Sequence, residues 1–99
     1  MTRRELIQLL LEKYGQEARV KEGTAYALIR PIGLKNDKAP MEYLYTGTPD
    51  QKPVAGDVIA TAEGSYVTAR SGVETVAGEE LYVWAVLHGE GETALCTEE

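Results

Sequence analysis

The sequence predicts a mainly β (α+β) fold: an N-terminal helix followed by a small five- to six-stranded antiparallel β-barrel or sandwich. Three observations lead to this fold class. Residues 2–14 carry a helical pattern of apolar side chains, and from residue 16 onward short strand-like segments alternate with turn residues at roughly regular spacing. The segment 79–88 is apolar on both strand faces. One face of such a strand fits the interior of a closed sheet, and another part of the protein must shield the second face from water.

The predicted helix covers residues 2–14. Thr2 and Glu5 have the spacing of a capping box, in which each side chain bonds the other residue's backbone N–H. Gly15 is positioned as a left-handed stop. The apolar arc of the helix is wide, which is typical of a helix that lies on a sheet or at an interface. A helix of this length is marginal alone in water, so we expect it to dock.

Strand signals then follow in order, separated by polar loops at 33–39 and 48–57. Pro31 ends the first of these segments, and we expect an edge or a bulge there, because proline lacks the N–H that a central strand donates. Glu63 and Gly64 mark the turn of a short hairpin. The predicted strand segments are 24–32, 41–47, 58–62, 65–70 and 72–78 leading into 79–88.

We predict one domain over residues 1–88 and an acidic, glycine-rich C-terminal tail over 89–99 that frays. Leu28, Tyr66 and Trp84 are the expected core residues. Cys96 is the only cysteine, so no intrachain disulfide forms, which fits a reducing compartment. No stretch reaches the roughly 18 apolar residues of a membrane span, so we expect a soluble product that contacts no membrane.

The charge of −6 is unevenly distributed. Residues 1–38 carry eight Lys or Arg and five Asp or Glu, whereas residues 39–99 carry two and eleven. An acidic chain is a poor general nucleic-acid binder. The split fits either a solvated surface with an acidic tail or a subunit that meets its neighbour head to tail. For the second case the candidate oligomer interface is Arg3, Arg4, Leu10, Tyr14, Arg30, Glu79 and Glu80.

Residues that carry chemistry are isolated in the sequence. His88 and Cys96 stand alone, and no pair has the spacing of a metal-binding motif. His88 is expected to be a surface histidine at the end of a strand. No glycine pattern predicts a phosphate cradle. We therefore expect no catalytic residues, no metal and no cofactor, and a structural or binding role in place of an enzymatic one.

Three stretches carry a family resemblance: LLLEKYGQEARV (9–20), AYALIRPI (25–32) and GDVIATAEGSYVTARSGVETVAGEELYVWAVL (56–87). Together they resemble the small head-tail connector proteins, of the stopper or head-completion class, found in tailed phages and in prophages of Gram-positive bacteria. The resemblance implies a β-barrel subunit that forms a ring below the portal, completes the head and receives the tail. The implied location is the head-tail junction of the virion, reached from the host cytoplasm during assembly.

The same resemblance implies partners and one loop. The partners are further copies of this chain, the portal or adaptor protein and the tail proteins, with at most non-specific proximity to packaged DNA. A loop between early strands projects into the channel in that family, and the matching position here is 33–39, with Lys35, Asn36, Asp37 and Lys38 as candidate channel-facing residues. The alternative hypothesis is a small SH3-like or OB-like barrel adaptor that binds a peptide or nucleic acid.

Overall fold

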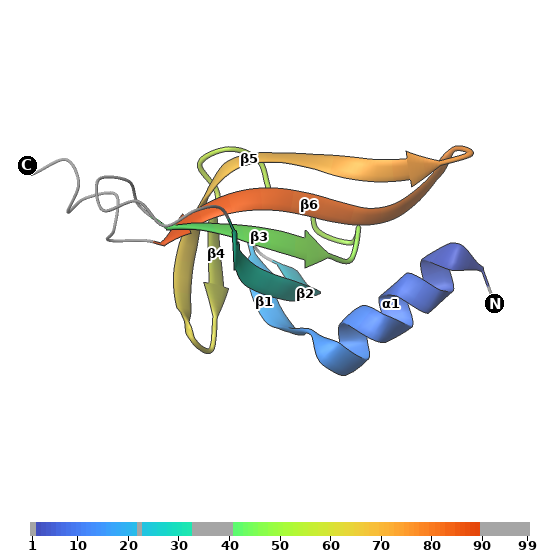
Figure 1. Cartoon of the computed structure of the whole chain (residues 1–99), viewed down its shortest axis with the longest axis horizontal. Helices are drawn as coiled ribbons and strands as arrows, with labels where there is room; N and C mark the ends of the chain where they lie inside the picture. Colours follow the sequence, from blue (N-terminus) through green and yellow to red (C-terminus); the bar gives the residue numbers. More distant parts are fainter. Residues whose placement is uncertain (1, 22, 33–40, 90–99) are drawn as a thin grey trace, which may run out of the picture.

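The computed structural model describes residues 2–21, 23–32 and 41–89. It shows one helix and a closed six-stranded antiparallel barrel in the order β1-β2-β3-β6-β5-β4, which confirms the predicted fold class (Figure 1). The channel-facing candidates Lys35, Asn36, Asp37 and Lys38 and the tail from residue 90 lie outside the described residues. The elements are α1 (Arg3–Tyr14), β1 (Gln16–Val20), β2 (Gly23–Ile32), β3 (Glu42–Gly47), β4 (Val58–Thr61), β5 (Gly64–Val76) and β6 (Glu79–Gly89).

Helix α1 begins as the sequence predicts and ends differently. The backbone N–H of Glu5 donates to Thr2 Oγ1 at 3.1 Å, and the N–H of Thr2 donates to Glu5 Oε1 at 2.9 Å, which completes the capping box. Gly15 is extended, with φ −89°, so its prediction as a left-handed stop is wrong. A side chain there would meet the carbonyl oxygens of Leu11 at 2.5 Å and Ala27 at 2.7 Å, so glycine permits the close approach of α1 to β2.

Strand β2 has an unpaired edge where proline stands. Its pairing with β1 ends at Ala27, whereas its pairing with β3 continues to Ile32. The backbone N–H of Thr48 donates to the carbonyl of Tyr26, so Tyr26 and every second residue after it direct their backbone groups toward β3. Pro31 therefore faces the unpaired side, and its missing N–H removes no sheet hydrogen bond.

Strand β5 joins two segments that the sequence analysis separated. An extra residue, Ala69, lies between the paired residues Thr68 and Arg70 and forms a bulge, after which the strand continues to Val76. A two-residue turn, Ala77 and Gly78, then leads into β6 with φ of 53° and 82°, as in a type I′ hairpin. Beyond their last β4 and β3 partners, β5 and β6 pair only with each other. We call residues 73–82 the arm; it projects past the barrel in Figure 1.

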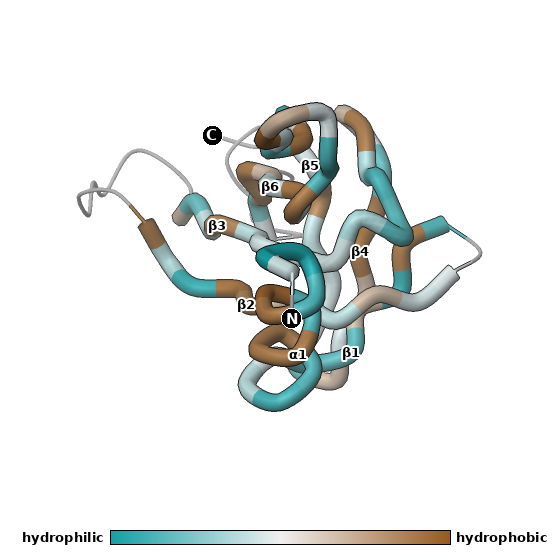
Figure 2. Tube along the Cα trace, turned by 90° about the vertical axis from the view of Figure 1, so that its right-hand side faces the viewer, coloured by the Kyte–Doolittle hydropathy of each residue, from teal (hydrophilic) through white to brown (hydrophobic). Residues whose placement is uncertain are grey.

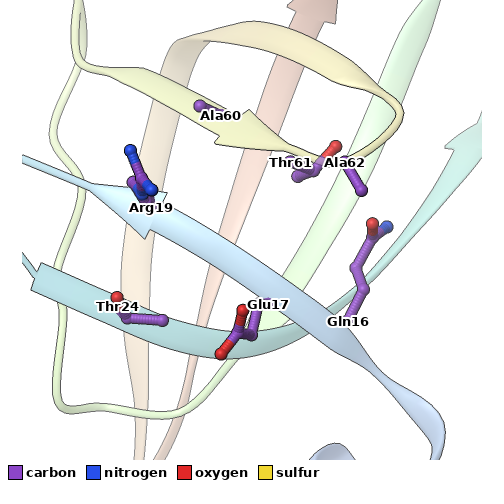
Figure 3. A pocket seen from close by; sticks show the side chains of 7 residues that line it. All are labelled: Gln16, Glu17, Arg19, Thr24, Ala60, Thr61 and Ala62. Atoms are coloured by element: carbon purple, nitrogen blue, oxygen red, sulfur yellow. The ribbon is translucent and has the colours of Figure 1, made fainter.

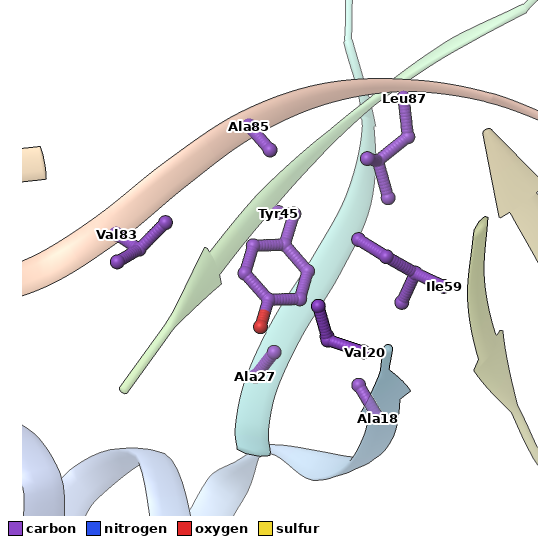
Figure 4. Close-up of a cluster of buried hydrophobic side chains, with 8 residues drawn as sticks. All are labelled: Ala18, Val20, Ala27, Tyr45, Ile59, Val83, Ala85 and Leu87. Carbon is purple, nitrogen blue, oxygen red and sulfur yellow. The ribbon is translucent and has the colours of Figure 1, made fainter. Parts of the chain in front are cut away.

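The barrel interior is built around Tyr45, the largest fully buried side chain (Figure 4). The side chains that surround it are mostly small or branched: Ala18, Val20, Ala27, Ile59, Val83, Ala85 and Leu87. On β2 the fully buried inward residues are Ala25 and Ala27, and Ile29 is partly buried against the core. Leu28 is 43% exposed on the outer face, so its assignment to the core is wrong. The Tyr45 ring fills the centre of the narrow barrel, so the space left at the alanine positions fits only a small side chain.

The other two expected core aromatics divide between the faces. Tyr66 packs against the core and meets Tyr43 edge to face, with ring centroids 5.1 Å apart, so its prediction is confirmed. Trp84 is part-buried on the outer face of β6, so its assignment to the core is wrong. The inward residues of that strand are its neighbours at odd positions, from Leu81 to Leu87.

The Tyr45 hydroxyl is buried and makes no hydrogen bond within the described part of the chain. Burial raises the pKa of Tyr45 from 10.0 to about 12, because the apolar interior disfavours the phenolate. A buried hydroxyl without a partner usually costs stability, whereas an apolar group of the same shape does not.

We predict that Tyr45→Phe is neutral or stabilising at pH 7 and gains a further advantage in alkali. Above pH 10 the unfolded chain loses the Tyr45 proton while the folded chain keeps it, so wild-type stability falls until the folded pKa is passed. Relative to Tyr45→Phe, the wild-type free energy of unfolding should fall by roughly 2–3 kcal/mol between pH 10 and 12. Denaturant unfolding of both proteins across this range measures the difference. A constant difference would mean that the hydroxyl is solvated.

Candidate interaction surface

The outer side of strands β2, β3, β6 and β5 forms one continuous surface, which we call the four-strand face. Residues opposite each other in an antiparallel pair lie on the same side of the sheet, so the strand registers place outward side chains in rows. One row is Leu28, Thr46, Trp84 and Gly72, the next is Arg30, Leu44, Val86 and Arg70, and the third is Ile32, Glu42, His88 and Val67. The surface is thus apolar along its middle and charged at several margins.

The indole ring of Trp84 packs against the backbone of the neighbouring strand, β5. It lies opposite Gly72 of β5, and a side chain at Gly72 would meet the indole ring at 2.6 Å. The indole therefore covers the bare glycine backbone, which is a stabilising cross-strand arrangement. This explains how β6 can be apolar on both sides: the inner residues fill the barrel, and Trp84 lies against its own sheet.

Two arginines flank the apolar centre of the four-strand face. Arg30 on β2 and Arg70 on β5 are both exposed, and neither forms an ion pair with a residue that the structure describes. Between them lie Leu44, which is part-buried, and Val86, which is 4% exposed. An apolar centre between two unpaired guanidinium groups suits a partner that brings both apolar contacts and carboxylates.

His88 lies at the end of β6, as expected, opposite Glu42 of β3. Its Nε2 is 3.5 Å from a Glu42 carboxylate oxygen. Both side chains are partly exposed. Within the described ranges, no group of three or more His, Cys, Asp and Glu side chains is placed to hold a metal ion. The pair is therefore a cross-strand contact on the four-strand face.

A polar hollow of about 680 Å³ lies where the barrel closes between β1 and β4 (Figure 3). In the described part of the chain these strands pair at two positions, Arg19 with Ala60 and Val20 with Ile59. Beyond Thr61 the chain turns into β5, so the first half of β1 has no β4 partner. The hollow is lined by Gln16, Glu17, Arg19, Thr24, Ala60, Thr61 and Ala62. These residue types are common on solvent-exposed strand surfaces, so they do not indicate a ligand site.

Helix α1 exposes a large part of its apolar surface. Leu11 is buried, whereas Leu6, Leu9 and Leu10 are 44–50% exposed and Tyr14 is 64% exposed. Figure 2 shows this hydrophobic helix at the periphery of the molecule, beside the barrel. The predicted interface residues Leu10 and Tyr14 are thus available at the surface. Scattered apolar residues need no explanation, but four on one short helix form a patch that favours a partner.

The charged residues predicted for the oligomer interface lie at separate places. Arg3 and Arg4 are in the first turn of α1, and Glu79 and Glu80 begin β6 in the arm. Glu80 forms an ion pair with Lys52 at 3.1 Å within the same chain. Arg30 lies opposite Leu44, which in turn pairs with Val86, six residues from Glu80 along β6. The predicted set is thus spread over α1, β2 and β6, and its role as an oligomer interface stays a prediction.

Comparisons with known proteins give no relatives: no family model, curated protein or solved structure matches the chain. No helix in the described residues is long and apolar enough to cross a membrane.

Sequence reasoning missed the four-strand face, although the two arginines and Trp84 were all visible. The signal that could have found it is the pairing of Gly72 with Trp84, since a glycine within a strand often marks a close approach by a neighbouring group. Arg70 was missed because the bulge at Ala69 changes the alternation of β5 before that residue.

We predict that Trp84→Ala costs only about 1–2 kcal/mol of unfolding free energy, because the indole is part-buried on an outer sheet face. Tyr45→Ala is the matched control and should cost roughly 3–5 kcal/mol, as other buried aromatic truncations do. Chemical denaturation of both variants measures the two costs. Equal losses would place Trp84 in the stabilising core after all.

Proposed function

We propose that this protein is a self-associating structural subunit of a phage or prophage head-tail connector, forming a ring below the portal that completes the head and joins the tail. The observation that carries this proposal is that two elements extend beyond the barrel and leave apolar side chains or strand edges uncovered within the described chain. These are α1, with its exposed leucines, and the arm, whose outer edges are unpaired. The principal-axis extents of 50 × 25 × 22 Å reflect this elongation.

The physical argument begins with the arm. An isolated two-stranded ribbon is marginal in water unless something packs against it. On one side the arm and β6 are supported by α1, which contacts both β6 and β2. The opposite surface of α1, with Leu6, Leu9, Leu10 and Tyr14, has no comparable support in the described chain. A second subunit that covered this surface would order both projecting elements.

The sequence resemblance supplies the specific assembly, and the closed barrel agrees with the β-barrel subunit that the resemblance implies. In this proposal the partners are further copies of this chain in a ring, the portal or adaptor protein on one side and tail proteins on the other. Contact with packaged DNA is non-specific. The site of action is the head-tail junction of the virion, and assembly takes place in the host cytoplasm.

A second candidate function is a small barrel adaptor that binds a peptide or nucleic acid. Trp84, in the row next to that of Arg30 and Arg70, favours it, since a part-buried aromatic ring with guanidinium groups nearby can contact an extended ligand. The net charge of −6 weighs against a general nucleic-acid binder. Genes for portal, capsid and tail proteins beside this gene would favour the connector.

We predict that the purified protein self-associates as its concentration rises and that negative-stain images of the associated fraction show closed rings. Leu10→Glu should abolish this association, because it places a charge on the exposed helix surface. Stability should change by no more than about 0.5 kcal/mol, as is usual for exposed positions. Sedimentation velocity over a concentration series, with thermal unfolding of each variant, makes the measurement.

Val54→Glu is the matched control, since Val54 is 53% exposed but lies outside α1. It should associate as the wild type does. A wild type that stays monomeric at the highest concentrations and forms no rings would contradict the proposal. Equal loss of association in both variants would remove the helix from the interface.

A further inference from the structure

We propose that the acidic arm of one subunit lies across the four-strand face of the next subunit, with carboxylates of the arm paired to Arg30 and Arg70. This inference rests on the proposed self-associating function and names the contact by which neighbours join. It identifies the occupant of the four-strand face as a second copy of this chain. The contact joins two different surfaces and is therefore heterologous, the kind that closes into rings.

Charge is the first reason to choose this occupant. The arm carries Glu74, Glu79 and Glu80 and no Lys or Arg. Glu80 is already paired with Lys52, whereas Glu74 and Glu79 form no ion pair with any described residue. The four-strand face supplies two exposed arginines that likewise lack such a pair. Complementary charges of this kind steer association and fix the register between subunits.

The geometry of the strands requires that the contact be between molecules. Arg70 and Glu74 lie on the same strand, four residues apart, so about 13 Å of extended backbone separates them. The arm is the continuation of the very strands that form the four-strand face, and it runs away from that face along their direction (Figure 1). An arm can therefore reach Arg30 and Arg70 only on another copy.

The width and the apolar character of the arm also match those of the four-strand face. Arg30 and Arg70 are three strand spacings apart, or about 14 Å between their Cα atoms. The two strands of an arm, with side chains, fit between them, so that each arginine can reach a carboxylate. Val76 of the arm is 36% exposed and would meet the part-buried Leu44 at the centre of the face. Contact there would also support the ribbon, which has unpaired edges on both sides.

The test uses charge reversal on the full chain. The face variant is Arg30→Glu with Arg70→Glu, and the arm variant is Glu74→Arg with Glu79→Arg. Each alone should weaken self-association at least tenfold, because each places like charges opposite each other. An equimolar mixture should recover association, since the reversed arm of one variant meets the reversed face of the other and the remaining arm and face are both wild type. Sedimentation velocity at low and high salt measures all four samples.

Arg19→Glu is the control, because Arg19 lies in the hollow beside β1, away from the four-strand face; its association should equal that of the wild type. Circular dichroism and thermal unfolding establish that each variant is folded. Recovery in the mixture, together with loss of association in the arm variant alone, would support the arm-on-face contact, since reversing the arm leaves a symmetric face-to-face contact unchanged.

The outcomes separate this inference from the function on which it rests. If the wild type forms rings and both reversals leave them intact, the arm-on-face contact is wrong and the connector proposal stands. If the wild type never associates, the connector proposal itself fails. Binding of a fluorescent single-stranded oligonucleotide by the wild type, lost in the face variant, would overturn the inference and assign the four-strand face to a nucleic acid.

Discussion

The small cross-section of a six-stranded barrel is the constraint on which the rest of this structure depends. A closed barrel must be filled by its own side chains, and here the ring of Tyr45 occupies the centre. Gly47 must remain glycine because a side chain there would meet the Tyr45 ring at 2.7 Å. Neighbouring strands accordingly direct alanine inward, at Ala18, Ala27 and Ala85. Some larger apolar residues, such as Leu28, consequently lie on the outside, where they create surfaces that suit partners.

Local signals in the sequence predicted the elements well. The capping box of Thr2 and Glu5 and the edge position of Pro31 each depend on chemistry within a few residues, and both appear in the structure. The alternation of polar and apolar residues likewise indicated most strands. Tyr66 was assigned correctly: it lies opposite Ile59 in the β4–β5 hairpin, and both side chains pack on the core.

Which side chains of each strand point into the barrel could not be predicted in the same way, because this depends on which residue fills the interior. In β2 Leu28 looks like a core residue, yet the fully buried inner positions belong to alanines, with only Ile29 among the larger residues packed against the core. Trp84 was misplaced for a related reason: size suggested burial, but only the register with Gly72 reveals an outer face. The candidate surface therefore depended on long-range pairing, and sequence analysis recovered single members of it, such as Arg30, without their arrangement.

The short pairing between β1 and β4 is the place where the barrel should open most easily. Among the residues that the structure describes, two pairs close the cylinder there, whereas β5 and β6 share ten paired positions. Local opening would start where fewest backbone hydrogen bonds must break, and it would unroll the cylinder into a curved open sheet with α1, β1 and β2 at one end. Such a sheet exposes two strand edges that the closed form conceals, and exposed edges pair with other chains. Amide hydrogens near Arg19 and Ala60 should therefore exchange with solvent sooner than those along β6.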